Sequence, residues 1–572
     1  MNDDLHTLRH SAAHVLAQAV KRLWPKTKLA IGPPIEEGFY YDVSPDQPLT
    51  DEDLPAIEAE MAKIVKEGQS FKQSWMTKEE AQKFFDERQE PFKKEIIREI
   101  PDSKVSIYTD GDFVDLCEGP HLKSTGEISS FKLLSLAGAY WRGNERNPQL
   151  TRIYGTAFFS TAELENFLKV REEAKARDHR KLGSSLKLFS ILEEAGAGLV
   201  FYHPRGAVLR QLIEAYASQQ HARRGYQPVI TPHVLRSDIW VRSGHTQYYK
   251  PNMYTFEVEN QEWGLKPMNC PGHILIYQTS KRSYRELPLR FFELGTVYRN
   301  EKSGVLHGLL RVRGFTQDDA HIFCRVSQLE AELTQILDFI QAVFKDFGFS
   351  EYHVEMSTRP TEFLGNEAQW NEAEVVLTQA LKEKGVPFTV SPGAGAFYGP
   401  KIDVHVKDTL GRFWQCATVQ LDFVLPQRFN LKYVESDGKE VAPVMIHRAI
   451  FGSLERFLGT LIEQYAGAFP AWLAPVQAVV IPLTQDQESY AREIALVLTE
   501  TDLRVEVDDR RETLQARIRD AQLSKVPYML IVGKREAQAR NVSVRARTAG
   551  DLGGMGLDEF VRRITHEVEG KK

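Results

Sequence analysis

Cysteine is scarce in this sequence, and the four residues present lie far apart, at positions 117, 270, 324 and 416. Four scattered cysteines are too few for the disulfide framework of a small secreted domain, so we expect a reducing compartment, by default the cytoplasm. No apolar run reaches the roughly 18 residues that a membrane span needs. The first ten residues, MNDDLHTLRH, carry no signal-peptide pattern. A protein that neither spans a membrane nor is exported is therefore expected.

A strong net charge is also missing. The 72 Lys and Arg residues are balanced by 78 Asp and Glu residues, so any nucleic-acid site must be a local basic patch. The common phosphate-binding glycine loops are absent as well: there is no Gly-x-x-x-x-Gly-Lys-Ser/Thr motif and no Gly-x-Gly-x-x-Gly after a strand. If ATP binds, side chains must hold it, and arginine suits this role because its guanidinium grips a phosphate with two hydrogen bonds.

The length of 572 residues is enough for roughly three or four domains. Residues 1–155 predict an α+β domain, with an amphipathic helix from Leu5 to Trp24, an aromatic strand (GFYYDV) and a polar helix from Glu52 to Glu67. The charged run AELENFLKVREEAKARDHRK predicts a linking helix across residues 156–182.

The remaining sequence changes character once more. Residues 183–470 contain many strand-like runs between helices, which predicts a largely antiparallel sheet with flanking helices. In residues 471–572 the apolar strands VQAVVIPL, LRVEVD and YMLIVG alternate with helices, which is typical of a small α/β domain with a mainly parallel sheet. The whole chain is thus predicted to be a multidomain α+β protein.

The segment RVRGFTQDDAHIFC places polar side chains at every second position. If it is a strand, one face carries Arg311, Arg313, Phe315, Gln317, Asp319 and His321, and the other carries Val312, Asp318 and Ala320. A solvated face of an ordinary sheet is the alternative interpretation. The preceding strand ends in YRNE, and the Gly-containing loop KSGVLHG follows, so a hairpin would bring Arg299 and Glu301 to Arg311.

Three motifs in this order resemble those of the threonyl-tRNA synthetases, which are class II aminoacyl-tRNA synthetases. They are MNCPGH (268–273), YRNE followed by RVRGFTQDDAHIFC (298–324), and MIHRAIFGSLERF (445–457). The resemblance covers essentially the whole chain. It implies an N-terminal editing domain, a class II catalytic core of antiparallel sheet with flanking helices, and a C-terminal α/β anticodon-binding domain.

The resemblance also implies roles for residues of the core. Arg299 would hold the α-phosphate of ATP, Arg311 and Arg456 the distal phosphates, and Glu301 and Phe315 the adenine. Further positions match the surroundings of ATP (Lys401, Gln415, Thr418) and of threonine (Met268, Gln317, Asp319, Tyr398, Gln420, Ala449). His245 matches a histidine that takes the proton from the terminal 2′-hydroxyl of the tRNA, a task suited to imidazole near neutral pH.

Cys270, His321 and His447 match the family's three zinc ligands, which implies one Zn²⁺ per subunit, with Mg²⁺ accompanying ATP. Spacing alone would not have revealed this set, because the three residues lie far apart and a lone Cys or His is usually a core residue. Three protein ligands leave a coordination position open for substrate. In the family this zinc binds the amino group and the hydroxyl of threonine.

Serine keeps the hydroxyl of threonine and lacks one methyl, a difference of only about 1 to 3 kcal/mol, so proofreading is expected. His10 and His14 in the first helix, with Cys117 and His121 in DLCEGPHL, have a spacing that fits a tetrahedral zinc site. The resemblance instead implies an editing site that hydrolyses seryl-tRNA without a metal. Lys93, which is next to Lys94, and Tyr41 and Asp115 match further positions of that site.

Between Lys534 and Arg547 there are five cationic residues and one acidic residue, a local basic patch on an acidic protein. Arg519, Glu536 and Arg545 match anticodon-reading positions, and Arg511 stands where relatives carry Asn. A solvated charged face is the alternative. Many family members begin with a small ubiquitin-like domain, whereas this sequence starts directly at the editing helix.

The resemblance therefore predicts a homodimer, paired across VITPHVL (229–235), that ligates L-threonine to tRNA(Thr) through an adenylate formed from ATP. Two other interpretations make different predictions for the sequence. A catalytically inactive, synthetase-like RNA-binding regulator would have a broken set of arginines or metal ligands. A free editing hydrolase would not need residues 183–470.

Overall fold

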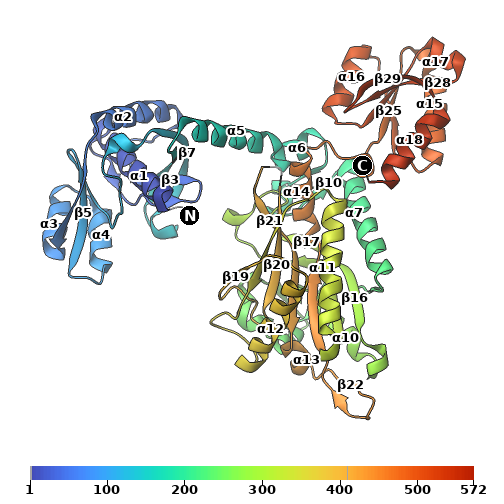
Figure 1. The fold of residues 1–572 in the computed structure, drawn as a ribbon, viewed down its shortest axis with the longest axis horizontal. Helices are drawn as coiled ribbons and strands as arrows, with labels where there is room; N and C mark the ends of the chain where they lie inside the picture. The colour runs from blue at the N-terminus through green and yellow to red at the C-terminus, as the bar shows by residue number, and fades with distance from the viewer. Residues whose placement is uncertain (1–2, 409, 572) are drawn as a thin grey trace. The chain divides into compact units, whose positions relative to one another are not determined.

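The computed structural model describes residues 3–408 and 410–571, which form two compact units, residues 1–172 and 173–572. Each unit mixes helices with β-sheet (Figure 1), as the sequence predicted. None of the described helices is both long enough and apolar enough to cross a membrane.

The first unit is built on a long N-terminal helix, α1 (Asp3–Leu23), packed against a sheet. The strand order of this sheet is β1-β3-β8-β7, with β2 paired to β3. Leu8, Val15 and Leu16 of α1 are fully buried against Phe39 and Ile153 of the sheet, which accounts for the helical spacing of these apolar residues. The elements are β1 (Lys28–Leu29), β2 (Pro34–Ile35), β3 (Gly38–Ser44), α2 (Leu54–Glu67), β7 (Ser130–Tyr140) and β8 (Gln149–Phe158).

A smaller lobe is inserted between α2 and β7. Three antiparallel strands, β4 (Phe71–Thr77), β5 (Lys104–Asp110) and β6 (Phe113–Leu116), form its sheet. Two helices, α3 (Lys78–Glu87) and α4 (Pro91–Glu99), pack on it around a small apolar core that includes Phe85 and Ile97. The end of β5 and the loop after β6 approach α1, so side chains from the helix and the lobe meet at one place.

The linking helix predicted from the charged run is two helices. α5 (Thr161–Arg177) ends before Asp178, and α6 (His179–Ser185) begins after it. The Asp178 carboxylate accepts the backbone N–H of Arg180 and so caps α6. Because an N-cap residue has a non-helical backbone, the cap interrupts the helix.

The second unit is centred on an eight-stranded sheet in the order β11-β16-β17-β24-β21-β20-β18-β19. Only the outermost pairs, β11 with β16 and β18 with β19, are parallel, which confirms the predicted antiparallel character. The strands are β11 (Gln227–Pro228), β16 (Leu289–Tyr298), β17 (Gly314–Cys324), β18 (Tyr352–Ser357), β19 (Thr389–Ser391), β20 (Lys401–Lys407), β21 (Phe413–Asp422) and β24 (Val444–Ala449).

Helices cover this sheet and enclose a large apolar core. In α11, buried Leu333, Ile336, Ile340 and Val343 recur at three- and four-residue spacing and form one apolar face. The main helices are α7 (Pro204–Arg223), α8 (Asp238–Ser243), α10 (Cys270–Gln278), α11 (Leu329–Asp346), α12 (Glu367–Glu383), α13 (Val424–Arg428) and α14 (Leu454–Gln464). Two small sheets, in the orders β12-β14-β13 and β15-β22-β23, and the pair β9-β10 complete this region. Their strands are β9 (Phe189–Ser190), β10 (Phe201–Tyr202), β12 (Val234–Arg236), β13 (Thr255–Val258), β14 (Gln261–Leu265), β15 (Arg282–Ser283), β22 (Tyr433–Val434) and β23 (Glu440–Val441).

The C-terminal sheet has the order β26-β25-β27-β28-β29 and is mixed. β25 (Ala478–Pro482) pairs in parallel with β26 (Val505–Val507) and β27 (Tyr528–Val532). β28 (Asn541–Ala546) and β29 (Gly550–Gly556) extend it in antiparallel fashion, so the predicted parallel sheet holds for only part of the domain. Its helices are α15 (Glu488–Glu500), α16 (Leu514–Leu523), α17 (Lys534–Ala539) and α18 (Leu557–Glu569).

Candidate functional site

The alternating segment forms β17 and lines a cavity. Phe315, Gln317, Asp319 and His321 all face a cavity of about 630 Å³, while Asp318 points into the core. The alternation fails before the strand begins, because Arg313 turns away and its guanidinium donates to the backbone oxygens of Ala197 and Glu301. The polar face is therefore a cavity wall and not an ordinary solvated face.

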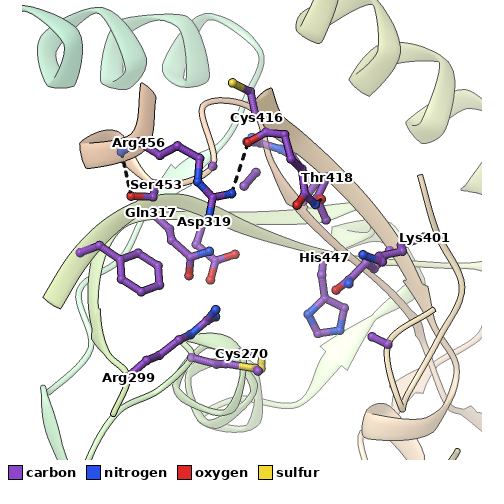
Figure 2. A pocket seen from close by; sticks show the side chains of 18 of the residues that line it. Cys270, Arg299, Gln317, Asp319, Lys401, Cys416, Thr418, His447, Ser453 and Arg456 are labelled. Carbon is purple, nitrogen blue, oxygen red and sulfur yellow. Dashed lines mark hydrogen bonds between the residues drawn. The ribbon is translucent and has the colours of Figure 1, made fainter. Parts of the chain in front are cut away.

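The cavity collects the predicted core residues from several strands and two helices. Arg299 and Arg456 reach into it from opposite sides, with Gln317 and Asp319 between them (Figure 2). Every core residue assigned by the resemblance except His245 lines this one cavity: Met268, Cys270, Arg299, Glu301, Arg311, Phe315, Gln317, Asp319, His321, Tyr398, Lys401, Gln415, Thr418, Gln420, His447, Ala449 and Arg456.

Cationic side chains cluster at one end of the cavity. The β16–β17 hairpin brings Arg311 to Glu301, with 2.9 Å between Nη2 and Oε2, as the sequence predicted. The guanidinium of Arg299 lies 5.0 Å from the ring centroid of Phe315. Arg456, on the first turn of α14, donates to the carbonyl oxygen of Leu310. This end of the cavity offers three guanidinium groups to an anion.

Asp403 organises three of these neighbouring positions and was not identified from the sequence. Its buried carboxylate is 2.6 Å from Lys401 Nζ and accepts the side-chain amide of Gln415 at 2.7 Å. The Thr418 hydroxyl donates to the same carboxylate. All three partners lie on β20 or β21, which are adjacent in the sheet, but a single acidic residue in a strand gives no local signal of this role.

The loop between Arg299 and Arg311 is held at its far end by His179. The fully buried His179 ring accepts the backbone N–H of Leu309 with Nε2, while its Nδ1 lies 2.7 Å from the Glu463 carboxylate. Gly308 has a φ of +49°, and a Cβ there would lie 2.1 Å from His179 Nε2. A bulky residue at position 308 would push this contact apart.

His321 and His447 lie directly opposite each other on β17 and β24, and Cys270 at the start of α10 completes a group whose ligand atoms are within 4.8 Å of one another. Nε2 of His321 lies 2.9 Å from Nδ1 of His447. The other nitrogen of His447, Nε2, donates to the Asp422 carboxylate at 2.8 Å, so its Nδ1 carries a lone pair. A cation bound between these nitrogens and the thiolate would satisfy them, so the donor set fits zinc.

Three of the positions matched to threonine, Asp319, Tyr398 and Gln420, are oriented by hydrogen bonds. Asn269 donates to the Asp319 carboxylate at 3.0 Å. The Tyr398 hydroxyl donates to the Gln420 side-chain oxygen at 2.7 Å. Both contacts orient polar groups beside the three candidate metal ligands.

His245 does not line the cavity. It is fully buried, with Nδ1 2.7 Å from the Ser243 hydroxyl and Nε2 3.0 Å from the sulfur of Met268, and Met268 itself faces the cavity. Burial, together with nearby cationic side chains, lowers the pKa of His245 to about 3. The proposed proton-accepting role of His245 stays a prediction.

A second cavity, of about 700 Å³, lies in the first unit and contains most of the residues assigned to editing. It is lined by His10, His14, Tyr41, Lys93, Asp115 and Cys117. His121 lies behind Cys117, with its Nε2 3.2 Å from Sγ. The four residues of the HxxxH and CxxxH pairs also have ligand atoms within 4.8 Å of one another, so the geometry does not by itself exclude a metal.

Lys93, Asp115 and Tyr41 form one buried cluster. Lys93 Nζ is 2.6 Å from Asp115 Oδ1, and the Tyr41 hydroxyl donates to Asp115 Oδ2 at 2.5 Å. Lys94 instead points away and pairs with Asp86. The geometry supports Lys93, not its neighbour, as the lysine of this cavity.

The thiol of Cys117 is surrounded by imidazoles. Burial opposes its ionisation, but interactions with His10 and His14 outweigh burial and lower the pKa of Cys117 to about 6. Burial also opposes protonation of His14, yet Asp110 and Cys117 raise the pKa of His14 to about 10. The pair therefore favours a thiolate next to an imidazolium at neutral pH.

Two residues of this site were missed in the sequence. Asp110, at the end of β5, is fully buried 3.9 Å from His14 Nδ1, and neither of its carboxylate oxygens has a hydrogen-bond partner among the described residues. The Ser11 hydroxyl lies 3.2 Å from His121 Nδ1 and accepts the backbone N–H of Leu122. Although Ser11 directly follows His10, neither Ser11 nor Asp110 belongs to a recognisable motif.

The predicted basic patch is only partly available. Arg540 pairs with Glu493, and Arg547 donates to backbone oxygens. In contrast, the guanidinium groups of Arg511, Arg519 and Arg545 have no ion-pair partner in the part of the chain that the structure describes. Glu536 caps α17 by accepting the backbone N–H of Gly533.

Three family models match the chain. Residues 254–465 match the class II tRNA synthetase core domain shared by the G, H, P, S and T enzymes, and residues 477–567 match an anticodon-binding domain. Residues 105–154 match the second additional domain of threonyl- and alanyl-tRNA synthetases. The matches fall on the two cavities and on the C-terminal sheet.

Curated relatives match over nearly the whole chain. A threonine–tRNA ligase of Oleidesulfovibrio alaskensis is 53% identical over 567 residues, which cover 99% of this chain and 88% of the relative. That of Caldanaerobacter subterraneus subsp. tengcongensis is 52% identical over 563 residues, covering 98% and 87%.

Solved structures agree with these relatives. The RNA-binding domain of threonyl-tRNA synthetase from Cryptosporidium parvum has a TM-score of 0.66 and 42% identity, covering 68% of this chain and 98% of that one. A putative threonyl-tRNA synthetase from Aeropyrum pernix has a TM-score of 0.61 and 30% identity, covering 69% and 97%. With the cavity of arginines, the Cys/His/His group and the second cavity in place, these matches establish that the chain belongs to the threonine–tRNA ligase family, within the class II aminoacyl-tRNA synthetases.

Proposed function

We propose that the protein ligates L-threonine to tRNA(Thr), using ATP and releasing AMP and pyrophosphate, and that its first unit hydrolyses seryl-tRNA(Thr). The observation that carries the ligase function is the convergence of Arg299, Arg311 and Arg456 with the Cys270, His321 and His447 group in a single cavity. One end suits a triphosphate and the other suits an amino acid.

The arginines take the phosphates of ATP. Arg299 holds the α-phosphate, and Arg311 and Arg456 hold the distal phosphates, so the guanidinium groups stabilise the charge that develops when the threonine carboxylate attacks and pyrophosphate leaves. Arg311 then partly exchanges its present contact with Glu301 for a phosphate. Phe315 stacks on the adenine, and Glu301 receives its edge. Mg²⁺ that accompanies ATP would neutralise further phosphate charge.

The other end of the cavity receives threonine. Zn²⁺ held by Cys270, His321 and His447 would act as a Lewis acid that binds the amino group and the side-chain hydroxyl of the substrate. Asp319 lies beside this group, with its carboxylate oriented by Asn269, and accepts hydrogen bonds from the substrate. Valine lacks the hydroxyl and is rejected strongly, whereas serine is rejected weakly.

The second cavity hydrolyses the seryl-tRNA(Thr) that weak rejection of serine produces. Lys93, Tyr41 and Asp115 position water and the ester carbonyl, and Cys117 with His10 and His14 supplies groups for proton transfer. The low thiol pKa is consistent with a metal-free site, because a thiolate beside an imidazolium needs no metal to be stable.

We further propose that Arg519 and Arg545 contact the anticodon, because neither guanidinium has an ion-pair partner among the residues that the structure describes. The chain is proposed to form a homodimer through residues 229–235, where Ile230 is 90% exposed. The four free cysteines are typical of the cytoplasm, which is the proposed location.

The test is amino-acid-dependent exchange between ATP and pyrophosphate. We expect strong exchange with threonine, weaker exchange with serine and almost none with valine, all of it lost when zinc is removed. A folded, zinc-loaded protein that exchanges with none of the three would contradict the ligase and favour an RNA-binding regulator. The intact set of arginines and metal-ligand positions in one cavity argues against that alternative.

A further inference from the structure

A chain of buried polar side chains extends from His321 away from the cavity. It passes through His273, on the first turn of α10, to Glu293 on β16, and it ends at Thr231 and Lys266. All of these side chains are at least nine-tenths buried. Burying a histidine, a carboxylate and a lysine is costly unless each is paired, so the network needs a reason.

The far end of the network fixes the charge of Glu293. Its Oε1 accepts the backbone N–H of Thr231 at 2.9 Å and the ammonium of Lys266 at 3.1 Å. Burial opposes ionisation of Glu293, but the hydrogen bonds from His273 and Thr231 and the charge of Lys266 outweigh burial and lower its pKa. Glu293 is therefore a carboxylate, and both of its oxygens are acceptors.

The tautomers of the two histidines follow from this carboxylate. Glu293 Oε2 lies 3.1 Å from His273 Nε2, so His273 must donate its proton there. The Nδ1 of a neutral His273 is then an acceptor, and it lies 2.8 Å from Nδ1 of His321. His321 donates its Nδ1–H in turn, which leaves the lone pair on Nε2 facing Cys270 and His447.

The backbone is arranged so that this network can form. The Cα of Gly272, next to His273, comes so close to Thr231 that a Cβ would lie 2.7 Å from its Cγ2. Helix α10 can therefore come this close to Thr231, whose backbone N–H binds Glu293, only with glycine at position 272. The candidate ligand Cys270 and His273 lie on the same short helix. The hydrogen-bonded series Glu293–His273–His321 is called the relay below.

We propose that His273 and Glu293 are positioning residues for the metal. Glu293 holds His273 in the tautomer whose Nδ1 accepts the hydrogen bond from Nδ1–H of His321, and this bond fixes the tautomer and ring orientation in which Nε2 of His321 is a metal ligand. His447 is served by Asp422 directly, whereas His321 is served by a carboxylate through a second histidine. Groups that orient a ligating histidine in this way typically contribute 10- to 100-fold to metal affinity. The inference rests on the metal site of the proposed function.

Two substitutions at position 273 distinguish the hydrogen bonds of His273 from the volume that its side chain fills. His273→Gln keeps both hydrogen bonds, because its amide oxygen accepts from His321 and its amide N–H donates to Glu293. His273→Leu has similar volume and makes neither bond. We expect the zinc dissociation constant, measured by chelator competition on the full-length chain, to change less than about threefold for His273→Gln and to rise about 10- to 100-fold for His273→Leu.

Glu293→Gln provides an independent test. The backbone N–H of Thr231 and the ammonium of Lys266 both donate to Oε1, so the amide oxygen stays there. The NH₂ group then faces His273, and the Thr231 hydroxyl, which donates to Oε2 in the unchanged chain, must rotate and accept from it. This arrangement reverses the direction of the hydrogen bonds and places a proton on Nε2 of His321. We expect a zinc affinity as weak as that of His273→Leu and an altered Co²⁺ absorption spectrum. The matched control is His221→Gln, since His221 is also fully buried but lies outside the network.

The outcomes are distinct. If the unchanged chain binds no zinc, the metal site itself is wrong. If the unchanged chain binds zinc and His273→Leu binds it as tightly, the proposed relay is wrong. It is also wrong if His273→Gln and His221→Gln lose as much zinc affinity as His273→Leu. A thermal melt of each apo variant shows whether it is folded, and an unfolded Glu293→Gln leaves the pair at position 273 to decide.

Discussion

Lys93 and Asp115 form a buried ion pair, with 2.6 Å between Nζ and Oδ1, at a place where two cavities of the first unit share a wall. One is the 700 Å³ cavity with Cys117, and the other, of about 310 Å³, is lined by Lys21 and Arg22. The pair therefore borders both cavities, although each of its side chains is only 3% exposed.

Replacing Lys93 by Ala would leave the Asp115 carboxylate buried without its cation. We expect the first unit to lose about 3 to 5 kcal/mol of unfolding free energy, together with most of its seryl-tRNA deacylation. Lys94→Ala is the control, because the Lys94–Asp86 pair is near the surface and should contribute at most about 1 kcal/mol. Chemical denaturation and deacylation of preformed seryl-tRNA measure the two effects, and equal losses in both variants would contradict the assignment.

The reactivity of Cys117 should depend on pH in an unusual range. Alkylation requires the thiolate, and the pKa of Cys117 is about 6, so the rate should rise through pH 6 and level off near neutrality. Burial raises the pKa of Cys324 and of Cys416, which should react slowly. His14→Asn removes a cation next to the thiol and should move the profile to higher pH. A profile that keeps rising above pH 8 in the unchanged chain would refute the thiolate.

Removal of metal should separate the two cavities functionally. A chelator should abolish threonine-dependent exchange and leave seryl-tRNA deacylation within about twofold. Beside Cys270 two histidine nitrogens face each other and would be satisfied by a cation, whereas the Cys117 thiolate is already stabilised by the His14 imidazolium. Addition of zinc should restore exchange. Parallel loss of deacylation, restored by the same addition, would instead show that His10, His14, Cys117 and His121 hold a metal.

The anticodon proposal predicts different results for two nearby arginines. Arg519→Ala should weaken tRNA binding and reduce the dependence of the binding constant on salt by about one ion. Arg510→Ala should have a smaller effect, because Arg510 already pairs with Asp508 and Asp520. Filter binding across a range of salt concentrations gives both slopes. Indistinguishable variants would mean that the exposed cations do not contact RNA.

Ile230→Asp should dissociate the proposed homodimer. A carboxylate at the centre of an apolar contact would have to be buried without a partner, and sedimentation equilibrium should then report a monomer. Leu496→Asp is the matched control, since Leu496 is 60% exposed on α15, far along the chain from residues 229–235. A dimer that survives Ile230→Asp would place the interface elsewhere.

Local patterns predicted the elements and the cavity face from Phe315 to His321, because periodicity is a local property of the chain. The sheet order and the roles of Asp403 and Asp110 were not predictable in this way, since each acts on residues brought close only by tertiary packing. β29 was missed because its sequence, GDLGGMG, contains four glycines, which are rare in strands.

The resemblance supplied the candidate metal ligands but not the residues that support them. His273 was visible in the motif MNCPGH, yet nothing in the sequence connects it with Glu293, twenty residues later on another element. The interruption of the linking helix at Asp178 follows from an N-cap within a run that otherwise favours helix throughout.

The contact between Gly308 and His179 has a consequence for the sequences that the loop after Arg299 can tolerate. In a library that randomises residues 302–310 and is selected for growth, position 308 should return glycine almost alone, because any side chain meets the His179 ring at 2.1 Å. Gly304, in the same loop, has no atom within 4 Å of its Cβ position and should accept many residues. Two glycines four residues apart would thus differ sharply in the variation that selection permits.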